Sequence, residues 1–348
     1  MTIYRNVPII GANGEYEKSR LVKGFRTGAS PDSPALIEMV FTEDFSSGGT
    51  PLLEARGLTK HYGSTIALEN VDFQVHGGIT GLLGHNGAGK STAIKLFLGI
   101  LSPSSGSALV FGKNASESIE IRAMLGYMPE HDCLPPNTTA SEFLTHMAQV
   151  SGLPPASART RAADMLRHVG LAEERYRALG SYSTGMKQRA KLAQALVHDP
   201  AIVLLDEATS GLDPAGREEM LDLIRRTGRE FGISILLSSH LMGDIERTCD
   251  SIIVLDGGHV AEEGALATFT GDTQTILIEL DDGLDEVVRN LTQKHITAKV
   301  EGPLIVVELE NEEQYDHIRD AVVEAEARLR RLAPRRHGLA DIFRSAHQ

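Results

Sequence analysis

The stretch GHNGAGKST at residues 84–92 decides how the whole chain is interpreted, because an apolar strand pattern precedes it and a helical pattern follows it. It matches G-x-x-x-x-G-K-[ST], in which the glycines let the backbone curl so that successive amide N–H groups face one anion. The N-terminus of the following helix adds partial positive charge at the same place. A glycine-rich turn without chemistry is the alternative, and both flanking patterns argue against it. The stretch therefore predicts a site for a nucleoside triphosphate.

Two side chains of this loop have expected roles of their own. The ammonium of Lys90 should reach the terminal phosphates, and the hydroxyl of Ser91 should coordinate Mg²⁺. The loop residues expected to bind nucleotide are Gly84, His85, Asn86, Gly87, Ala88, Gly89, Lys90, Ser91 and Thr92.

A second informative stretch, IVLLDEATSGLDP at residues 202–214, is an apolar strand pattern that ends in two carboxylates. Ligands of α/β proteins bind at the carboxyl edge of the sheet, where this strand would end. Asp206 is placed to hold Mg²⁺ through water, and Glu207 to polarise an attacking water as general base. The alternative is an exposed strand end with two solvated carboxylates, and the phosphate loop in the same domain argues against it.

Composition narrows the class of protein. The 348 residues include 41% hydrophobic and 23% charged residues, which predicts a packed core, and the formal net charge of -13 excludes a binder that neutralises nucleic-acid phosphates. Cys133 and Cys249 show no metal-ligand spacing, which indicates reduced thiols in a cytosolic protein. No run reaches the ~18 apolar residues that span a bilayer, and the first residues lack a signal-peptide pattern. Any membrane function is therefore expected to depend on a partner.

The chain divides into three segments that differ in composition and in their pattern of apolar residues. Residues 1–50 are rich in Gly, Ser and Pro and are expected to be a disordered extension. Residues 51–271 alternate buried strand and helix patterns, with a helical insertion at about 137–182. The pattern of residues 272–348 predicts a small α+β domain of βαββα type, whose last helix covers 311–332.

Three motifs in this order and spacing resemble the ATPases of ABC transporters: GHNGAGKST, IVLLDEATSGLD and the intervening YSTGMKQRAKLAQAL at residues 182–196. The resemblance covers roughly residues 51–265. It implies an α/β fold, a P-loop NTPase core with an antiparallel β subdomain and a helical insertion, followed here by the small α+β domain. It implies ATP and Mg²⁺ as ligands and ATP hydrolysis as the activity.

The same resemblance assigns further residues. Tyr62 matches the aromatic that stacks on adenine, Asp213 the loop that touches the opposite subunit, and His240 the histidine that contacts the γ-phosphate. Glu130 stands where most members carry a glutamine that contacts magnesium and water, so it is a candidate both for catalysis and for the metal. A glutamate there keeps the oxygen ligand but adds a negative charge near Glu207, and like charges raise a carboxyl pKa.

The stretch YSTGMKQRAKLAQAL matches the small-residue motif that meets the ATP held by a second subunit. Ser183 is expected to cap the helix, and Ser183 and Gly185 to face the partner's γ-phosphate. Thr184 replaces the usual first glycine of this motif, and Met186 the usual glutamine. Lys187, Arg189 and Lys191 follow on an otherwise apolar, alanine-rich helix.

The resemblance also implies partners. Two ATPase subunits, as a homodimer or a heterodimer with a similar ATPase, would hold ATP at their interface, and the helical insertion would dock an integral membrane permease. The motif variants and the small C-terminal domain are similar to bacterial exporters, which places the chain at the cytoplasmic face of the inner membrane. No nucleic-acid partner is expected. The alternative is a soluble ABC ATPase that acts on the ribosome or on another non-transport complex.

A basic run, RLRRLAPRRHG at residues 328–338, has two interpretations. It is either a solvated helix end and linker or a contact with an anionic membrane surface, and the first is favoured.

Overall fold

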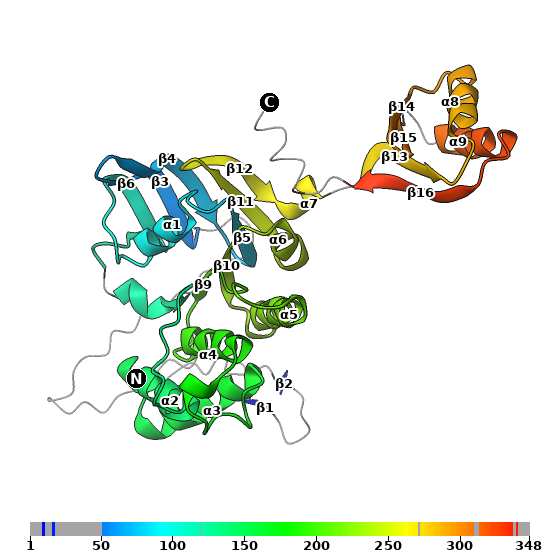
Figure 1. The fold of residues 1–348 in the computed structure, drawn as a ribbon. Coiled ribbons are helices and arrows are strands. Elements are labelled where there is room, and N and C mark those ends of the chain that lie inside the picture. Colours follow the sequence, from blue (N-terminus) through cyan, green and yellow to red (C-terminus); the bar gives the residue numbers. More distant parts are fainter. Residues whose placement is uncertain are drawn as a thin grey trace. The chain divides into compact units, whose positions relative to one another are not determined.

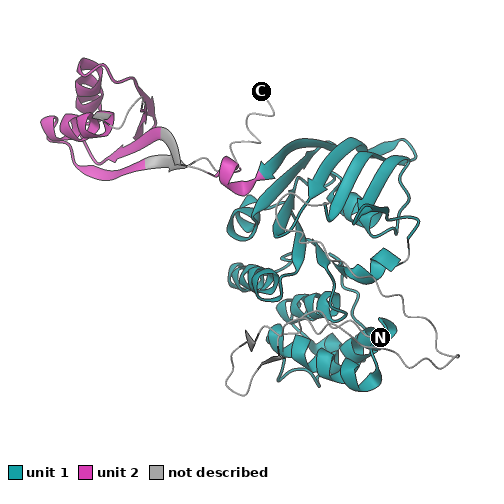
Figure 2. Cartoon of the chain, turned by 180° about the vertical axis from the view of Figure 1, so that it is seen from behind, with its two compact units in different colours: residues 1–264 teal, residues 265–348 magenta. Residues whose placement is uncertain are grey.

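The computed structural model describes residues 9–10, 16–17, 51–118, 120–270, 272–309, 313–336 and 339. The chain forms two compact units, residues 1–264 and 265–348 (Figure 2). Most of the extension expected to be disordered lies outside the described residues. Its described parts are β1 (Ile9–Ile10) and β2 (Tyr16–Glu17), which pair antiparallel.

A six-stranded sheet forms the centre of the first unit, in the order β12-β11-β5-β10-β9-β8 (Figure 1). The pairs β8–β9, β9–β10, β10–β5 and β5–β11 are parallel. Every residue of β5 and β9 is buried, as expected for strands covered on both faces. The strands are β5 (Ile79–Leu83), β8 (Leu125–Met128), β9 (Ile202–Asp206), β10 (Ser234–Ser239), β11 (Ser251–Asp256) and β12 (His259–Ala265).

An antiparallel sheet in the order β4-β3-β6-β7 lies beside it. Its strands are β3 (Leu53–Tyr62), β4 (Thr65–Val75), β6 (Ser105–Val110) and β7 (Lys113–Asn114). The fold therefore contains the α/β core and the antiparallel β subdomain that the sequence predicted.

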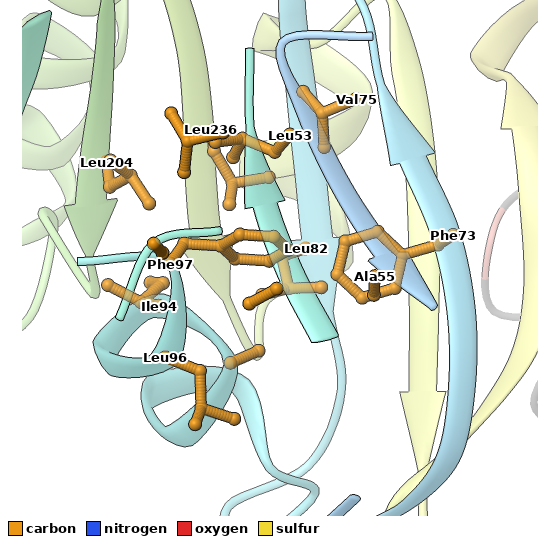
Figure 3. Packing of buried hydrophobic residues seen from close by; sticks show 14 of the residues in the cluster. Leu53, Ala55, Phe73, Val75, Leu82, Ile94, Leu96, Phe97, Leu204 and Leu236 are labelled. Atoms are coloured by element: carbon orange, nitrogen blue, oxygen red, sulfur yellow. The ribbon is translucent and has the colours of Figure 1, made fainter. Parts of the chain in front are cut away.

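Helix α1 (Lys90–Phe97) joins the two sheets through one hydrophobic core. Phe97 and Ile94 project from the helix among side chains of both sheets (Figure 3). The ring of Phe97 meets that of Phe73 edge to face, with 5.7 Å between centroids. The helix that follows the phosphate loop is thus fixed by burial of its apolar face.

Three helices, α2 (Ala140–Val150), α3 (Pro155–His168) and α4 (Thr184–Leu196), form a separate group (Figure 1). A capping box between Thr139 and Glu142 starts α2. Arg161 of α3 donates to two carbonyls at the end of α4.

The remaining elements of the first unit are the 3₁₀ turns Glu120–Met124 and Leu179–Ser181, and helices α5 (Pro214–Phe231) and α6 (Met242–Thr248).

His168, the last residue of α3, packs this group against α5. Its Nε2 lies 2.8 Å from Thr227 Oγ1, and its ring meets that of Phe231 edge to face. Burial lowers the pKa of His168 from 6.5 to about 4, with a further contribution from the charges of Arg226 and Arg161. The imidazole is therefore neutral in the folded protein at pH 7.

The second unit has a four-stranded antiparallel sheet in the order β14-β15-β13-β16. Helices α8 and α9 pack on it around a core that includes Ile276, Ile278, Val287, Ile305 and Ile318. The elements are α7 (Leu266–Phe269), β13 (Asp272–Leu280), α8 (Leu284–Gln293), β14 (Ala298–Glu301), β15 (Leu304–Glu308), α9 (Glu313–Glu324) and β16 (Leu329–Arg336). Among all helices of the described ranges, none is long and apolar enough to cross a membrane.

The expected helix over 311–332 is wrong in its second half. Helix α9 ends at Glu324, Glu326 adopts a left-handed φ of 50°, and the chain returns as strand β16 against β13. The unit is βαββαβ, not βαββα. Leu332 packs on the core opposite Ile278, because an antiparallel partner was available to this edge of the sheet.

The favoured interpretation of the basic run as a helix end and linker is corrected by the same strand. Arg330 pairs with Glu279 at 3.1 Å, and Arg328 with Asp282 at 3.8 Å. Both arginines thus have partners within their own unit.

Truncation of Phe97 tests the shared core. Phe97→Ala should lower the free energy of unfolding of the first unit by about 3–5 kcal/mol, because a fully buried ring leaves a cavity between the two sheets. Urea unfolding measures this loss. The matched control is Ile100→Ala, at a side chain that is 62% exposed, with an expected change within about 0.5 kcal/mol. Equal effects of the two variants would contradict the assignment of this core.

The neutral His168 predicts a pH dependence of stability. Between pH 6.5 and about 4, the imidazole of His168 is protonated in the unfolded chain but neutral in the folded protein. Stability is therefore complete above pH 6.5 and falls as the pH drops through this window, by up to about 3 kcal/mol. His168→Gln keeps a hydrogen-bonding group but loses the titration. Urea unfolding at pH 7.5 and 4.5 should show a smaller loss in the variant, and equal losses would refute the prediction.

Candidate functional site

The phosphate loop follows β5 and leads directly into α1. Gly89 is the N-cap of α1 with φ of +103°, and a Cβ there would lie 2.5 Å from the carbonyl oxygen of Ala67. A Cβ on Gly84 would lie 2.4 Å from the carbonyl oxygen of Leu255. Glycine is required at both positions by close approach of backbone, and at Gly89 also by its φ.

Lys90 is buried beneath the loop. Its ammonium donates to the carbonyl oxygens of Gly84 at 2.7 Å and His85 at 3.2 Å. It also forms an ion pair with Glu207 Oε1 at 3.3 Å. The cation expected to reach phosphate is therefore already next to the carboxylate that follows β9.

Ser91 and Asp206 meet across the site. The hydroxyl of Ser91 donates to Asp206 Oδ1 at 3.0 Å. Burial is the main cause that raises the pKa of Asp206, and the charge of Glu130 adds to the rise, while the hydrogen bond from Ser91 opposes it. The like-charge effect anticipated from the sequence thus acts on Asp206.

Glu207 is held from two sides. Its Oε2 accepts a hydrogen bond from His240 Nδ1 at 2.9 Å, while its buried Oε1 faces Lys90 and accepts no hydrogen bond from any residue that the structure describes. Its backbone has a left-handed φ of 48°, a conformation that costs a non-glycine residue about 1 kcal/mol or more. A buried carboxylate on a strained backbone, with one oxygen that is ion-paired to Lys90, fits a group that binds a water or a proton once that cation moves away.

Part of the phosphate loop and Glu207 border a pocket of about 300 Å³, whereas Asp206 and His240 are not among its lining residues. It is lined by Ala67, Asn86, Gly87, Gly89, Lys90, Ser91, Thr92, Glu130 and Glu207. All but Ala67 were expected from the sequence. Ala67 was missed because a small apolar residue in β4 carries no chemical signal, and only the folded structure places its carbonyl beside Gly89.

The other expected residues lie outside the lining of this pocket. Tyr62 is exposed, with the Lys60 ammonium 5.4 Å from its ring centroid. Ser183 caps α4 through a hydrogen bond from the Met186 amide at 3.3 Å, as the sequence predicted. Asp213 caps α5 by accepting from the Gly216 amide at 3.0 Å. Gly185, in the first turn of α4, is half-buried.

Glu130 lines the pocket from the loop that follows β8. Its backbone is held by a residue without an expected role, Lys191 of α4, which donates to the carbonyl oxygens of Pro129, Glu130 and His131. The signal was present in the sequence as a lysine within an alanine-rich helix. The partner of that lysine could not be known before the fold.

The donor set suits Mg²⁺. A hydroxyl and a carboxylate, Ser91 and Asp206, are oxygen ligands of the kind this ion prefers, and it is commonly bound by one or two protein groups together with phosphate oxygens. Among the described residues, no group of three or more His, Cys, Asp and Glu side chains is placed to hold a metal. The site thus fits a metal that arrives with a phosphate ligand.

Comparisons with known proteins show which family the chain resembles. The family profile described as ABC transporter matches residues 68–210. The chain is 37% identical over 230 residues to the uncharacterized ABC transporter ATP-binding protein YxlF of Bacillus subtilis, covering 66% of this chain and 76% of that protein. It is 35% identical over 219 residues to the Nod factor export ATP-binding protein I of Ralstonia nicotianae, covering 62% and 68%.

A solved structure gives the same result for the fold. The structure of cbiO1 from Clostridium perfringens, part of the ABC transporter complex cbiONQ, matches with a TM-score of 0.58 and 29% identity. The match covers 62% of this chain and 89% of that chain.

Gly89 offers a test of the loop geometry. Gly89→Ala should weaken binding of a magnesium–nucleoside triphosphate by at least about tenfold, because the methyl group displaces the loop from Ala67. Titration of a fluorescent ATP analogue measures the affinity. Gly152→Ala is the control, since Gly152 also has a positive φ but nothing within 4 Å of its Cβ position. Equal affinity in Gly89→Ala and the unsubstituted protein would overturn the proposed loop contact.

Proposed function

The chain belongs to the family of ABC transporter ATP-binding proteins, and on that premise we propose that it hydrolyses ATP to drive export through a partner membrane permease. The family binds ATP with Mg²⁺ and hydrolyses it. The observation that carries the proposal for this chain is the contact of Lys90, Glu207 and His240 at the mouth of the phosphate loop.

When ATP binds, the ammonium of Lys90 must exchange its ion pair with Glu207 for contacts with phosphate oxygens. The loop amides and the N-terminus of α1 receive the phosphates, and the ammonium moves from Glu207 toward the terminal phosphate oxygens. Ser91 and Asp206 would hold Mg²⁺, which would neutralise phosphate charge. Tyr62, exposed on β3, is available to stack on adenine.

Hydrolysis requires a base for the attacking water. Glu207, released from Lys90, offers Oε1, which accepts no hydrogen bond among the described parts of the chain. His240 fixes the other oxygen of this carboxylate and so sets its orientation. Glu130 adds a carboxylate to the same pocket, in a place suited to the metal and the water.

The remaining predicted residues support a second subunit. Ser183, Gly185 and Asp213 lie at helix starts outside the pocket lining, and Ser183 and Asp213 are exposed. Helix starts attract anions. We infer that they face the ATP of a partner ATPase, as a homodimer or a heterodimer, and that closure of the pair depends on ATP.

Transport direction and location follow as part of the proposal. One similar protein is named for export, and the motif variants and the C-terminal unit resemble those of exporters. The chain would act at the cytoplasmic face of the cell membrane through integral permease subunits. Helices α2 and α3 are proposed as the docking region for the permease.

The decisive substitution is Glu207→Gln. It keeps size and one hydrogen-bond acceptor but removes the base, so ATP hydrolysis should fall by at least about 100-fold while ATP is still bound. Phosphate release measures the rate, and size-exclusion chromatography with ATP should show an accumulated dimer.

Glu218→Gln provides the control for this experiment, because it makes the same chemical change at an exposed glutamate of α5 that pairs with Arg247. It should leave the rate within about twofold. Unchanged hydrolysis in Glu207→Gln would remove Glu207 from its proposed role.

A further inference from the structure

Two lysines one helical turn apart on α4 contact the loop that follows β8, one from a partly exposed position and one from a buried position. Lys187 pairs with Asp132 at 2.6 Å, at a partly exposed position. Lys191 is 2% exposed, which is rare for a lysine unless its charge is compensated by partners. The pair lies on α4, the helix capped by Ser183, so it links that helix to the segment that carries Glu130.

The ammonium of Lys191 directs its N–H donors to this loop. It lies 2.8 Å from the carbonyl oxygen of Pro129, 2.9 Å from that of Glu130 and 3.4 Å from that of His131. A lysine has three N–H donors, and here they meet three successive carbonyls. Buried charge-assisted hydrogen bonds are strong, and loss of one partner is costly, so the loop backbone is fixed to α4.

The charge of Lys191 also matters at this place. Burial is the largest influence on its pKa and lowers it, while the nearby carboxylates, including Glu130 and Asp206, act in the opposite direction. The resembled family has an uncharged glutamine where this chain has Glu130. Glu130 therefore carries a carboxylate near this ammonium where the resembled family has an uncharged side chain.

We propose that Lys191 is a positioning residue for Glu130, because it ties the backbone of Glu130 to α4 so that the two move as one body. The inference rests on the proposed ATPase function. On the same helix, Gln188 donates to the carbonyl oxygen of Ser210 at 2.9 Å, in the loop that leads to Asp213. A change at the start of α4, where a partner's ATP would bind, is thereby transmitted to Glu130 in this chain's own pocket.

The test compares Lys191→Met with Lys187→Met, two equal changes one turn apart on α4. In the nucleotide-free protein, amide hydrogen exchange of residues 127–134 should become about tenfold faster in Lys191→Met and change little in Lys187→Met. Exchange in α1 and α5 should stay the same in both variants. Unchanged exchange of the loop in folded Lys191→Met would overturn the proposal.

Hydrolysis provides the second readout. The kcat of Lys191→Met should fall by about tenfold with a KM for ATP within about threefold, because Glu130 is misplaced while the phosphate loop is intact. In a Glu130→Ala background the same substitution should have almost no further effect on kcat. A full tenfold loss in that background would show that Lys191 does not act through Glu130.

A third variant keeps the proposal testable in case Lys191→Met does not fold. Lys191→Arg keeps the charge and donors in a different geometry, and it should give loop exchange and kcat between those of the unsubstituted protein and Lys191→Met. Suppose that Lys191→Met does not fold. If Lys191→Arg then has the same loop exchange and kcat as the unsubstituted protein, the proposal that Lys191 holds the loop through three carbonyl oxygens is wrong. If the unsubstituted protein hydrolyses no ATP, the proposed function fails, while the exchange measurement still decides the role of Lys191.

Discussion

The shared register of four parallel strands is the constraint on which the site depends. Ser239 of β10 lies beside Leu83 of β5, Ser238 lies beside Asp206 of β9, and Met128 of β8 lies beside Leu205. The phosphate loop, the carboxylates, His240 and the loop with Glu130 therefore leave the sheet at one edge. A slip of one residue would turn each buried side chain to the other face of the sheet. Backbone hydrogen bonds and the packing of Phe97 between the two sheets thus place the chemistry.

Helix α4 connects three parts of the proposed mechanism. Its first turn carries Ser183 and Gly185, its second contacts Ser210 through Gln188, and Lys191 holds the loop with Glu130. These contacts all start from one helix of 13 residues and its N-cap. The network gives a physical reason for lysines on an alanine-rich helix: their partners are backbone carbonyls and an aspartate of a neighbouring loop.

Local patterns predicted most of the fold but failed where an edge strand was added late in the chain. The apolar runs that became β5, β9, β10 and β11 were predictable because a parallel strand must be buried on both faces. The segment after Glu324 has leucines at helical spacing, yet it pairs with β13 as β16. Short apolar patterns fit either structure, and the free edge of a sheet decided this one. The antiparallel register also gave Arg330 its partner, Glu279.

The sequence by itself determined the phosphate loop and predicted Ser91 and Asp206 as candidate metal ligands and Glu207 as the candidate base, because each depends on residue type at a fixed spacing beside a strand or helix. The tertiary structure alone decided that Lys90 pairs with Glu207, that His240 orients it, and that Lys191 anchors the loop of Glu130. These contacts join residues dozens of positions apart. Their energy comes from partners that only the packed sheet brings within hydrogen-bond distance, and no local pattern encodes which distant carbonyl or carboxylate a buried cation will meet.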